Sequence, residues 1–404
     1  MNVLVLNPGG NSLKVEVVSC APKQQLASEG KKLASVILEG IGTDPCMSVL
    51  QGKETIHTQP APAKDLSEAA HSIFSWLEEE EHISLDDIDC IGVRVVHGGT
   101  RFSAATRVTD DVEREIHGFE RLAPLHNKSS LELISPIRGR FRGVPLYAVF
   151  DTAFHRTMPE VAWRYPIPAD MADRHGIRRF GFHGTSHRYM MERASGLLGK
   201  DPRNVNLVTM HLESGCSATA IAKGKSVDNT MGFTPLEGLM MGTRSGDIDP
   251  ALIPFLVHEE KIEIDDVMTV LNKKSGLLAI SQKSLDTRVL MKEYGKDPRA
   301  TLAMDMFAYR LTKAVGALLC ALGGADAIVF GGGIGENTPL VRERVCSSLR
   351  WAGLDFDGEK NQDLIDVEGK VSTNASALAA LVVLTEEGLQ IAHECSRALE
   401  SGNV

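Results

Sequence analysis

Several features that mark large classes of protein are missing from this 404-residue sequence. Its seven cysteines are scattered, odd in number and never spaced Cys-x-x-Cys, which predicts reduced core thiols in a cytoplasmic protein rather than a disulfide framework or a zinc site. Basic residues are too few to balance the acidic ones. The formal net charge is −10, which argues against nucleic acid and anionic membranes as partners. An anionic ligand would have to be met by individual arginines.

Long hydrophobic runs are also missing. The first ten residues, MNVLVLNPGG, hold only a short apolar run and no basic residue, so they are not expected to be a signal peptide. Residues 314–335 carry a single charge, but Gly323 and Gly324 divide them into the end of a buried helix and a strand. No membrane span is predicted, and the length predicts two or three domains.

The common catalytic signatures do not occur either. There is no P-loop, and the glycine run at 331–335 does not open a βαβ unit with an acidic residue about 20 positions on. Asp151, His155 and His183 could form a hydrolytic cluster, but no Gly-x-Ser-x-Gly elbow accompanies them. His183 and His187 could pair on a metal, but Gly184 and the lack of a nearby third ligand make zinc a weak interpretation.

What the sequence does contain is a long segment without helix or strand periodicity, residues 228–250. Its only basic residue, Arg244, stands in Gly-Thr-Arg-Ser-Gly. Glycine lets a backbone approach a ligand closely and a guanidinium offers five donors, a combination that favours phosphate or carboxylate recognition. An ordinary loop is the alternative. Loops beyond about 12 to 15 residues are usually functional or disordered, and the apolar residues here argue against disorder.

Two strand-turn-strand patterns, about 200 residues apart, suggest a duplicated domain. Strands over 3–6 and 13–18 flank the turn 7–12, and strands over 207–210 and 218–222 flank the turn 211–217. A third glycine-bearing turn, 331–337, follows a strand over 326–330. Three such turns, with two arginines beside glycine or histidine loops, favour a protein that holds a polyphosphate between two halves.

Other elements complete this outline. We expect strands over 89–97, 146–150 and 377–384, and helices over 64–80, 254–258, 265–272, 299–322 and 386–399, with others starting after Thr109 and at Pro339. Asp151 follows the strand 146–150. In open α/β sheets the ligand binds at such carboxyl ends, so this carboxylate is well placed.

Six segments resemble the acetokinase family, in similar order and spacing over essentially the whole chain. They are VRVVHGG (93–99), LAPLHN (122–127), FDTAFH (150–155), RRFGFHGTSH (178–187), MGFTPLEGLMMGTRSGDIDP (231–250) and GGIGEN (332–337). The resemblance implies an α/β fold of two duplicated ribonuclease-H-like domains, shared with sugar kinases, Hsp70 and actin, and usually a homodimer. The expected domains are 1–152, rejoined by a C-terminal helix within 384–404, and 153–383, which would bind nucleotide and dimerise.

The resemblance also implies an activity and a set of site residues. The activity is that of an acetate kinase: reversible phosphoryl transfer from ATP to acetate, giving acetyl phosphate and ADP, with magnesium or manganese as cofactor. Arg94 and Arg244 would flank the phosphoryl group, with Asp151 and His183 as the other catalytic residues. The remaining expected groups are an acetate pocket of Val96, Leu125, Phe182 and Pro235; nucleotide and phosphate contacts from Asn7, Ser12, Lys14, His211, Gly215, Asp286, Arg288, Gly333, Gly335 and Asn337; and a metal site of Asn7, Asp151 and Glu387.

The chemistry of this set agrees with that activity. Phosphoryl transfer needs in-line positioning and positive charge around the phosphoryl oxygens more than covalent help. A carboxylate acceptor with a pKa of about 4 is already ionised at pH 7, so no general base is required. An apolar pocket separates substrates that differ by one methylene by only about 1 to 3 kcal/mol, so propionate should be accepted to some degree.

Three turns depart from the family pattern, all on the phosphate and nucleotide side. The family usually has Asn-x-Gly-Ser-Ser-Ser where this chain has NPGGNS (7–12), His-Leu-Gly-Asn-Gly where it has HLESG (211–215), and glycine where it has Gln282. A carboxylate about 4 Å from a phosphate oxygen costs on the order of 4 kcal/mol at an effective dielectric of 20, unless magnesium lies between them or the side chain turns away. We therefore predict weakened or altered nucleotide handling at Glu213.

Three alternatives stay open at this point. The enzyme could prefer propionate or butyrate, the chain could be a catalytically weak paralogue that binds nucleotide as a regulator, or pyrophosphate could replace ATP as the phosphoryl donor.

Overall fold

The computed structural model describes residues 1–21, 23–52, 54–79, 83–120 and 127–402, which form two compact units. Unit 1 consists of Met1–Phe154, Gly184–Tyr189 and the chain from Glu386 onward, and unit 2 of His155–His183 and Met190–Thr385. The first turn of the helix that starts at Gly184 groups with unit 1, whereas we expected all of 153–383 to form the second domain. One reason is that the Gly184 N–H donates to the carbonyl of Asp151, at 2.9 Å.

Unit 1 is built on one mixed sheet of eight described strands in the order β5-β4-β3-β2-β1-β6-β8-β7. The strands are β1 (Asn2–Pro8), β2 (Ser12–Ser19), β3 (Lys31–Glu39), β4 (Cys46–Gln51), β5 (Glu54–Pro60), β6 (Cys90–Val95), β7 (Thr106–Arg107) and β8 (Leu146–Phe150). The central strands have almost entirely buried side chains, because helices cover both of their faces.

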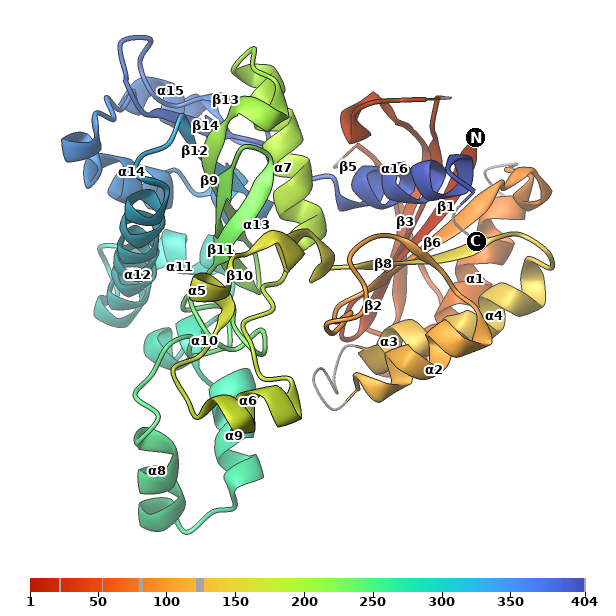
Figure 1. Cartoon of the computed structure of the whole chain (residues 1–404), viewed down its shortest axis with the longest axis horizontal. Coiled ribbons are helices and arrows are strands. Elements are labelled where there is room, and N and C mark those ends of the chain that lie inside the picture. The colour runs from red at the N-terminus through yellow and green to blue at the C-terminus, as the bar shows by residue number, and fades with distance from the viewer. Residues whose placement is uncertain (22, 53, 80–82, 121–126, 403–404) are drawn as a thin grey trace. The chain divides into compact units, whose positions relative to one another are not determined.

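The helices of unit 1 lie on opposite faces of this sheet (Figure 1). They are α1 (Leu66–Glu79), α2 (Asp110–Gly118), α3 (Asn127–Glu132) and α4 (Ile134–Arg140) on one face and α16 (Glu387–Glu400) on the other. As expected, Thr109 caps α2, its hydroxyl accepting from the Val112 N–H at 3.3 Å. The helix α16 contacts β6 and β1, so residues 387–400 pack against strands from the first hundred residues of the chain.

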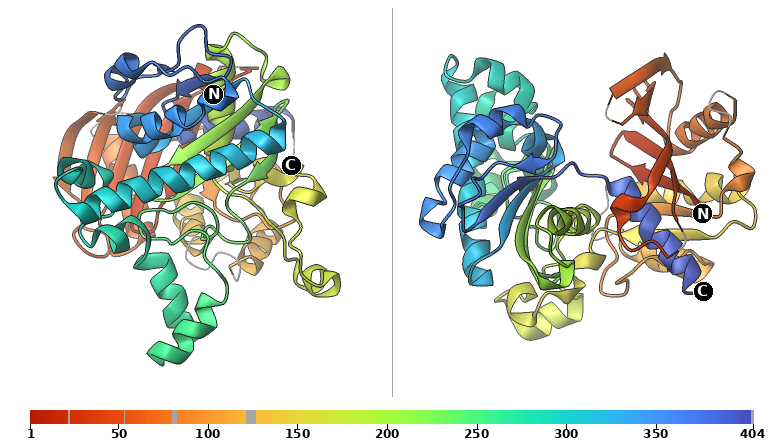
Figure 2. Two further views of the ribbon diagram at one scale, coloured as in Figure 1. Left: turned by 90° about the vertical axis from the view of Figure 1, so that its left-hand side faces the viewer. Right: turned by 90° about the horizontal axis from the view of Figure 1, so that it is seen from above.

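Unit 2 contains a second mixed sheet of six described strands in the order β11-β10-β9-β12-β14-β13. The strands are β9 (Asn206–Leu212), β10 (Cys216–Ala222), β11 (Lys225–Asn229), β12 (Ala327–Gly331), β13 (Gly369–Lys370) and β14 (Ala379–Val382). The long helix α12 (Pro298–Leu322), capped by Asp297, packs across β10 and β9, as Figure 2 shows. Residues of α7 (Gly184–Leu197) from Met190 onward cover the other face, where Met190 contacts Gly331 of β12.

The remaining helices of unit 2 are short. They are α5 (Glu160–Trp163), α6 (Ala169–His175), α8 (Leu252–Glu260), α9 (Ile264–Lys273), α10 (Gly276–Ser281), α11 (Thr287–Glu293), α13 (Gly332–Asn337), α14 (Pro339–Ser347) and α15 (Gly358–Asp363). None of the helices in the described part of the chain has the length and apolar character needed to span a membrane.

The two sheets repeat the same five-strand topology. In β3-β2-β1-β6-β8 and in β11-β10-β9-β12-β14, the central strand is antiparallel to its hairpin partner and parallel to the next two strands along. This confirms the predicted α/β class of two duplicated ribonuclease-H-like folds, which the two hairpins of the sequence had indicated.

Three predictions about local structure need correction. The turn expected over 331–337 is instead the last residue of β12, Gly331, followed by helix α13, in which the Glu336 carboxylate accepts from the Gly332 N–H at 3.0 Å. The strand expected over 377–384 shortens to β14, Ala379–Val382. Strands β3, β4 and β5 were not predicted at all.

Candidate active site

The strand ends of unit 1 hold a paired arginine and carboxylate. Arg94 lies near the end of β6 and Asp151 directly follows β8, and these two strands are parallel neighbours. The Arg94 Nε and Nη2 atoms donate to the two Asp151 oxygens at 2.9 and 2.5 Å. The Asp151 side chain is only 1% exposed, so this bidentate pair is held rigidly and largely out of water.

Asn7 connects this pair to the last helix of the chain. Arg94 Nη1 donates to the side-chain oxygen of Asn7 at 3.1 Å, and the Asn7 amide nitrogen donates to Glu387 Oε2 at 2.9 Å. Asp151, Arg94, Asn7 and Glu387 therefore form one network in unit 1, which we call the Arg94 network. It brings together all three residues that were expected to bind metal.

A second set of polar residues lies beside the first hairpin. Ser12 begins β2, and its carbonyl accepts from the Gly9 N–H at 2.8 Å. Lys14 does not stand alone, because its ammonium lies 3.1 Å from Glu16, which also pairs with Lys32 at 2.9 Å. Burial raises the pKa of Glu16, but the two lysines outweigh burial and hold that pKa below its ordinary value.

In unit 2, Arg244 and His183 converge on Gly215. A Cβ atom placed on Gly215 would lie 3.4 Å from both Arg244 Nη1 and His183 Nε2, so glycine keeps the space between these side chains open. Arg244 Nη1 also donates to the Pro235 carbonyl at 3.2 Å, and burial lowers the pKa of its guanidinium. Of the segment 228–250, which was expected to contain neither helix nor strand, residues 230–250 agree, whereas residues 228 and 229 end strand β11.

The imidazole of His183 is fixed from two sides. His183 has a left-handed backbone with φ of 57°, and its Nδ1 lies 2.9 Å from the Ser217 hydroxyl. Its ring lies 4.3 Å from that of His211, centroid to centroid. A non-glycine residue in this conformation is strained, which is common where a side chain must be aimed at a ligand. Arg244, His183, His211 and Gly215 form what we call the Arg244 cluster.

Glu213 extends this cluster to the glycine run. Its Oε1 accepts from the backbone N–H of Gly333 at 3.4 Å, and its Oε2 lies 4.0 Å from His211 Nε2. The Glu213 carboxylate thus accepts a hydrogen bond from a backbone N–H of the segment predicted to bind nucleotide.

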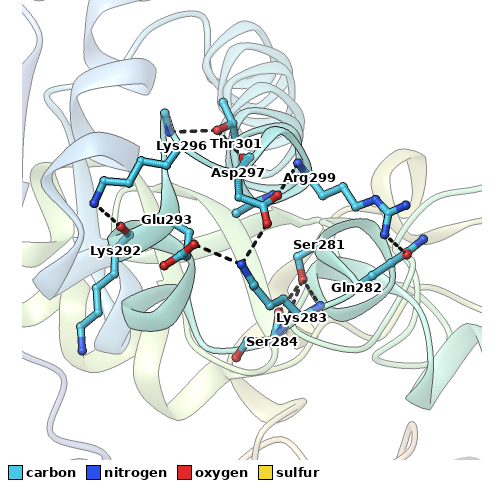
Figure 3. A network of polar contacts seen from close by, with 12 residues as sticks. Ser281, Gln282, Lys283, Ser284, Lys292, Glu293, Lys296, Asp297, Arg299 and Thr301 are labelled. Carbon is cyan, nitrogen blue, oxygen red and sulfur yellow. Dashed lines mark hydrogen bonds and ion pairs between the residues drawn. The ribbon is translucent and has the colours of Figure 1, made fainter.

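The residues expected on the adenosine side of the nucleotide lie at three places in unit 2. The Arg288 guanidinium pairs with both oxygens of Asp286, at distances from 2.7 to 3.1 Å. Asn337 exchanges hydrogen bonds with Asp366, and Gly333 and Gly335 belong to α13. Gln282 ends α10 with φ of 53° and accepts from Arg299, beside a network in which Lys283 joins Glu293 and Asp297 (Figure 3).

The four residues expected to form an acetate pocket belong to different parts of the chain, so the structure does not test this pocket. Val96 is half-buried in unit 1, whereas Phe182, fully buried, and Pro235, half-buried, belong to unit 2. Leu125 lies outside the described residues. The role of these four side chains stays a prediction.

Two residues that support the site, Glu336 and Ser217, were not singled out from the sequence. Glu336 is buried and accepts from Gly332 N, Thr385 N and the Thr385 hydroxyl, and Ser217 orients His183. Glu336 lies within the GGIGEN segment and could have been found from it. His155, by contrast, is a core residue, because its ring bonds Ser226 and the Phe182 carbonyl and burial lowers its pKa to about 4.

The donors of the Arg94 network suit a hard divalent cation. Asp151, Glu387 and Asn7 offer carboxylate and amide oxygens, and magnesium is usually held by one or two carboxylates together with substrate phosphates. No cluster of three or more His, Cys, Asp or Glu side chains that could hold a metal by themselves occurs among the described residues. A cation would therefore need oxygens from a ligand to complete its coordination.

The duplicated sheets place the protein in the fold class of acetate and sugar kinases, Hsp70 and actin. Sequence comparison makes this more specific, since the model of the Acetokinase family matches residues 2–393. A protein named acetate kinase from Solibacter usitatus is 41% identical over 407 residues, covering 99% of this chain and 98% of its own length. The chain belongs to the acetokinase family.

Two solved structures are similar over nearly the whole chain. Acetate kinase from Porphyromonas gingivalis superposes with a TM-score of 0.90 at 38% identity, covering 98% of this chain and 99% of that one. A propionate kinase from Francisella tularensis superposes with a TM-score of 0.88 at 34% identity and the same coverage.

Proposed function

We propose that the protein catalyses the reversible transfer of the γ-phosphoryl group of ATP to acetate, giving acetyl phosphate and ADP. Family membership over residues 2–393 supports this reaction. The structural observation that carries it is the Arg94 network, in which a buried carboxylate holds a guanidinium in fixed geometry at the strand ends. Preorganised positive charge of this kind is what stabilises a transferring phosphoryl group.

In this proposal each group of residues has a defined role. Arg94 and Arg244 neutralise the phosphoryl oxygens, Asn7 and His183 donate to them, and Asp151 and Glu387 with Asn7 hold a magnesium ion, for which manganese can substitute. A bound magnesium ion would neutralise charge on the donor phosphates. The proposed nucleotide contacts are Ser12, Lys14, His211, Gly215, Asp286, Arg288, Gly333, Gly335 and Asn337.

The acceptor needs no proton removed. Acetate is ionised at pH 7, because the pKa of such a carboxyl group is about 4, so it can attack phosphorus directly. Asp151 is therefore free to position Arg94 and magnesium rather than act as a general base. A rate that stays level from pH 6 to pH 8 would agree with this role.

The deciding experiment measures acetate-dependent ADP release in a coupled assay with magnesium, with ATP and pyrophosphate compared as donors. The proposal predicts turnover with ATP and a strong dependence on both acetate and magnesium. A protein that binds ATP in calorimetry but releases no ADP with any short acid would instead be the nucleotide-binding paralogue.

Propionate is the second candidate acceptor, and the similarity to the propionate kinase from Francisella tularensis favours testing it. One methylene is worth about 1 to 3 kcal/mol in an apolar pocket, so kcat/KM for acetate and propionate should differ by roughly 10- to 200-fold. A series of acetate, propionate and butyrate measures that ratio, and a higher kcat/KM for propionate would reassign the acceptor.

We also propose that the protein is a homodimer that associates through unit 2. Helix α8 has no buried residue although five of its nine residues, LIPFLVHEE, are aliphatic or aromatic, and Leu252 and Phe255 are exposed. Ile264 of α9, and Leu302 and Tyr309 of α12, are further exposed apolar side chains of unit 2. A second copy of the chain is the proposed occupant. Location in the cytoplasm is likewise a proposal, supported by seven free cysteines.

A further inference from the structure

The side chain of Glu213 lies against the glycine run, a segment proposed to bind the nucleotide. Glu213 directly follows β9, and its N–H donates to the Gly215 carbonyl at 3.2 Å, which closes the turn between β9 and β10. Its side chain is 51% exposed and reaches across to the glycine run. There Oε1 accepts from Gly333 N at 3.4 Å, and Cγ lies 2.9 Å from the position of a Cβ on Gly332.

The Glu213 carboxylate neighbours the side chains of the Arg244 cluster, which are proposed to bind an anion. Its Oε2 lies 4.0 Å from His211 Nε2, the His211 ring lies against the His183 ring, and His183 and Arg244 both border Gly215. Arg244, His183, His211 and Glu213 thus form a row of neighbouring side chains between Gly215 and the Gly333 N–H. Glu213 is the negatively charged member of this row, and it lies next to Gly333. A carboxylate oxygen and a phosphate oxygen are both anionic acceptors, so they compete for the same N–H and repel each other.

We propose that Glu213 is a donor-specificity residue, whose carboxylate competes with the donor's phosphates for the backbone N–H of Gly333. This inference rests on the proposed function, because it takes a phosphoryl donor to be the ligand of the glycine run. The penalty grows with negative charge on the donor and falls when a divalent cation neutralises it. Glu213 therefore favours the metal complex of a nucleotide over the metal-free nucleotide, and it does not affect acetate.

The test compares Glu213→Gln with wild type by calorimetry, using ATP with excess magnesium and ATP with a chelator. The variant keeps the shape and a hydrogen-bond acceptor but loses the charge. We expect metal-free ATP to bind about tenfold more tightly and Mg-ATP about threefold more tightly, so that the preference for the metal complex shrinks. Glu343→Gln is the matched control, because Glu343 is an exposed glutamate of α14 in the same unit and its loss changes net charge equally.

A purely structural role for Glu213 predicts a different result. If the side chain only stabilises the β9–β10 turn, Glu213→Gln lowers the unfolding temperature while both ATP affinities stay within twofold of wild type. That outcome, or an equal change in Glu343→Gln, overturns the proposal. Glu213→Gly is the second variant, and it should bind metal-free ATP at least as tightly as Glu213→Gln. The KM for acetate should stay within twofold in all three variants.

Binding and turnover separate this inference from the function on which it rests. If wild type releases no ADP with acetate but Glu213→Gln tightens ATP binding, the proposed reaction fails and the role of Glu213 stands. If wild type turns over acetate and ATP while the Glu213 variants bind ATP as wild type does, the reaction stands and the role of Glu213 fails.

Discussion

Gln282 occupies a backbone conformation that normally selects glycine. Its φ of 53° is left-handed, which costs a residue with a Cβ roughly 1 to 2 kcal/mol. Arg299 donates to the Gln282 side chain, and this hydrogen bond offsets part of the cost (Figure 3). The family glycine at this position therefore has a conformational reason, and its replacement need not affect nucleotide binding directly.

Removing the Cβ should stabilise the protein once that hydrogen bond is gone. In an Arg299→Ala background, we expect Gln282→Gly to raise the free energy of unfolding by about 1 kcal/mol, measured by urea denaturation. Gln282→Ala in the same background is the control, and it should give no gain because alanine keeps the Cβ. Equal stability of the glycine and alanine variants would show that the left-handed conformation is not strained.

The buried pair of Arg94 and Asp151 gives the clearest catalytic prediction. Asp151→Asn leaves a guanidinium without its counter-charge in a site that is 1% exposed on the Asp151 side. We expect kcat to fall at least 100-fold and stability to fall by about 3 kcal/mol, since breaking a buried pair leaves an uncompensated charge. Steady-state kinetics and urea denaturation measure the two effects.

The chain supplies a matched control for that substitution. Arg203 and Asp201 form a similar bidentate pair on the surface, with Nη2 to Oδ2 at 2.6 Å. Asp201→Asn should change kcat by less than twofold and leave the free energy of unfolding nearly unchanged, because exposed pairs contribute little. If the Asp151 and Asp201 variants behaved alike, burial would not be what makes the Arg94 pair important.

At this scale, the sequence predicts backbone placement better than side-chain partners. Asp151 and Arg94 could be placed together because both stand at the ends of apolar strands, and such ends meet when the strands are parallel neighbours. The contact of Glu213 with Gly333 could not be predicted, because it depends on the rotamer of a side chain that reaches a residue 120 positions away in the sequence. The ion pair of Lys14 with Glu16 could not be predicted either, because Lys32 also pairs with Glu16 and links it to Glu386, and both of these residues come from other segments of the chain.

Among the elements, α16 carries an unusual histidine. His393 is 0% exposed, and no partner is found for either ring nitrogen among the described residues. Burial lowers its pKa to about 4, assisted by Arg188 and Arg397 and opposed by Glu29 and Glu400. In the unfolded chain a histidine has a pKa near 6.5, so the unfolded state binds more protons between these values.

The stability contributed by neutral His393 should therefore be complete above pH 6.5 and lost as the pH falls toward 4. We expect a loss of about 2.5 kcal/mol at pH 4.5 from this residue alone. His393→Leu should reduce the fall in unfolding free energy between pH 7.5 and 4.5 by that amount, as measured by urea denaturation. His175→Gln, at an exposed position on α6, is the control and should keep the wild-type pH dependence. An unchanged dependence in His393→Leu would contradict the assignment.

Sequence signals located the elements that have clear ends. The helix α12 was expected over 299–322 and spans Pro298–Leu322, because Asp297 and Pro298 start it and Gly323 ends it. Strand β5 could not be read in the same way, since nearly all of its side chains are exposed and no alternation marks a buried face. Helix α13 was missed because three glycines in succession, with a fourth two positions on, normally mark a turn, and the bond from the Gly332 N–H to the Glu336 carboxylate could not be foreseen.

For the whole molecule, the proposed dimer gives a direct prediction. Phe255 on α8 is 57% exposed, and an aspartate there would have to be desolvated in an apolar interface. We expect Phe255→Asp to convert the dimer to a monomer in light scattering at micromolar concentration. Val161→Asp is the control, because Val161 on α5 is an apolar residue with 90% exposure outside the proposed surface. A wild-type protein that is monomeric would remove the proposal.

The duplicated architecture was the most predictable property of the whole chain. Two hairpins separated by about 200 residues indicated it, and the two matching strand orders confirm it. The grouping of Gly184–Tyr189 with unit 1 was not predictable from the sequence. The motif 178–187 runs across the boundary, and its residue His183 belongs to unit 2. Contacts decide that membership, and a single sequence does not report them.

The packing of α16 on β6 and β1 also bears on how the protein is made. A ribosome releases β1 long before α16, so one face of the first sheet has no cover until α16 has emerged. Unit 2 is complete at Thr385, before α16 emerges, and can fold first even though it is encoded second. The nascent chain would then carry an apolar sheet in need of temporary protection, and chaperone dependence in vivo should be governed by the time taken to translate residues 155–400.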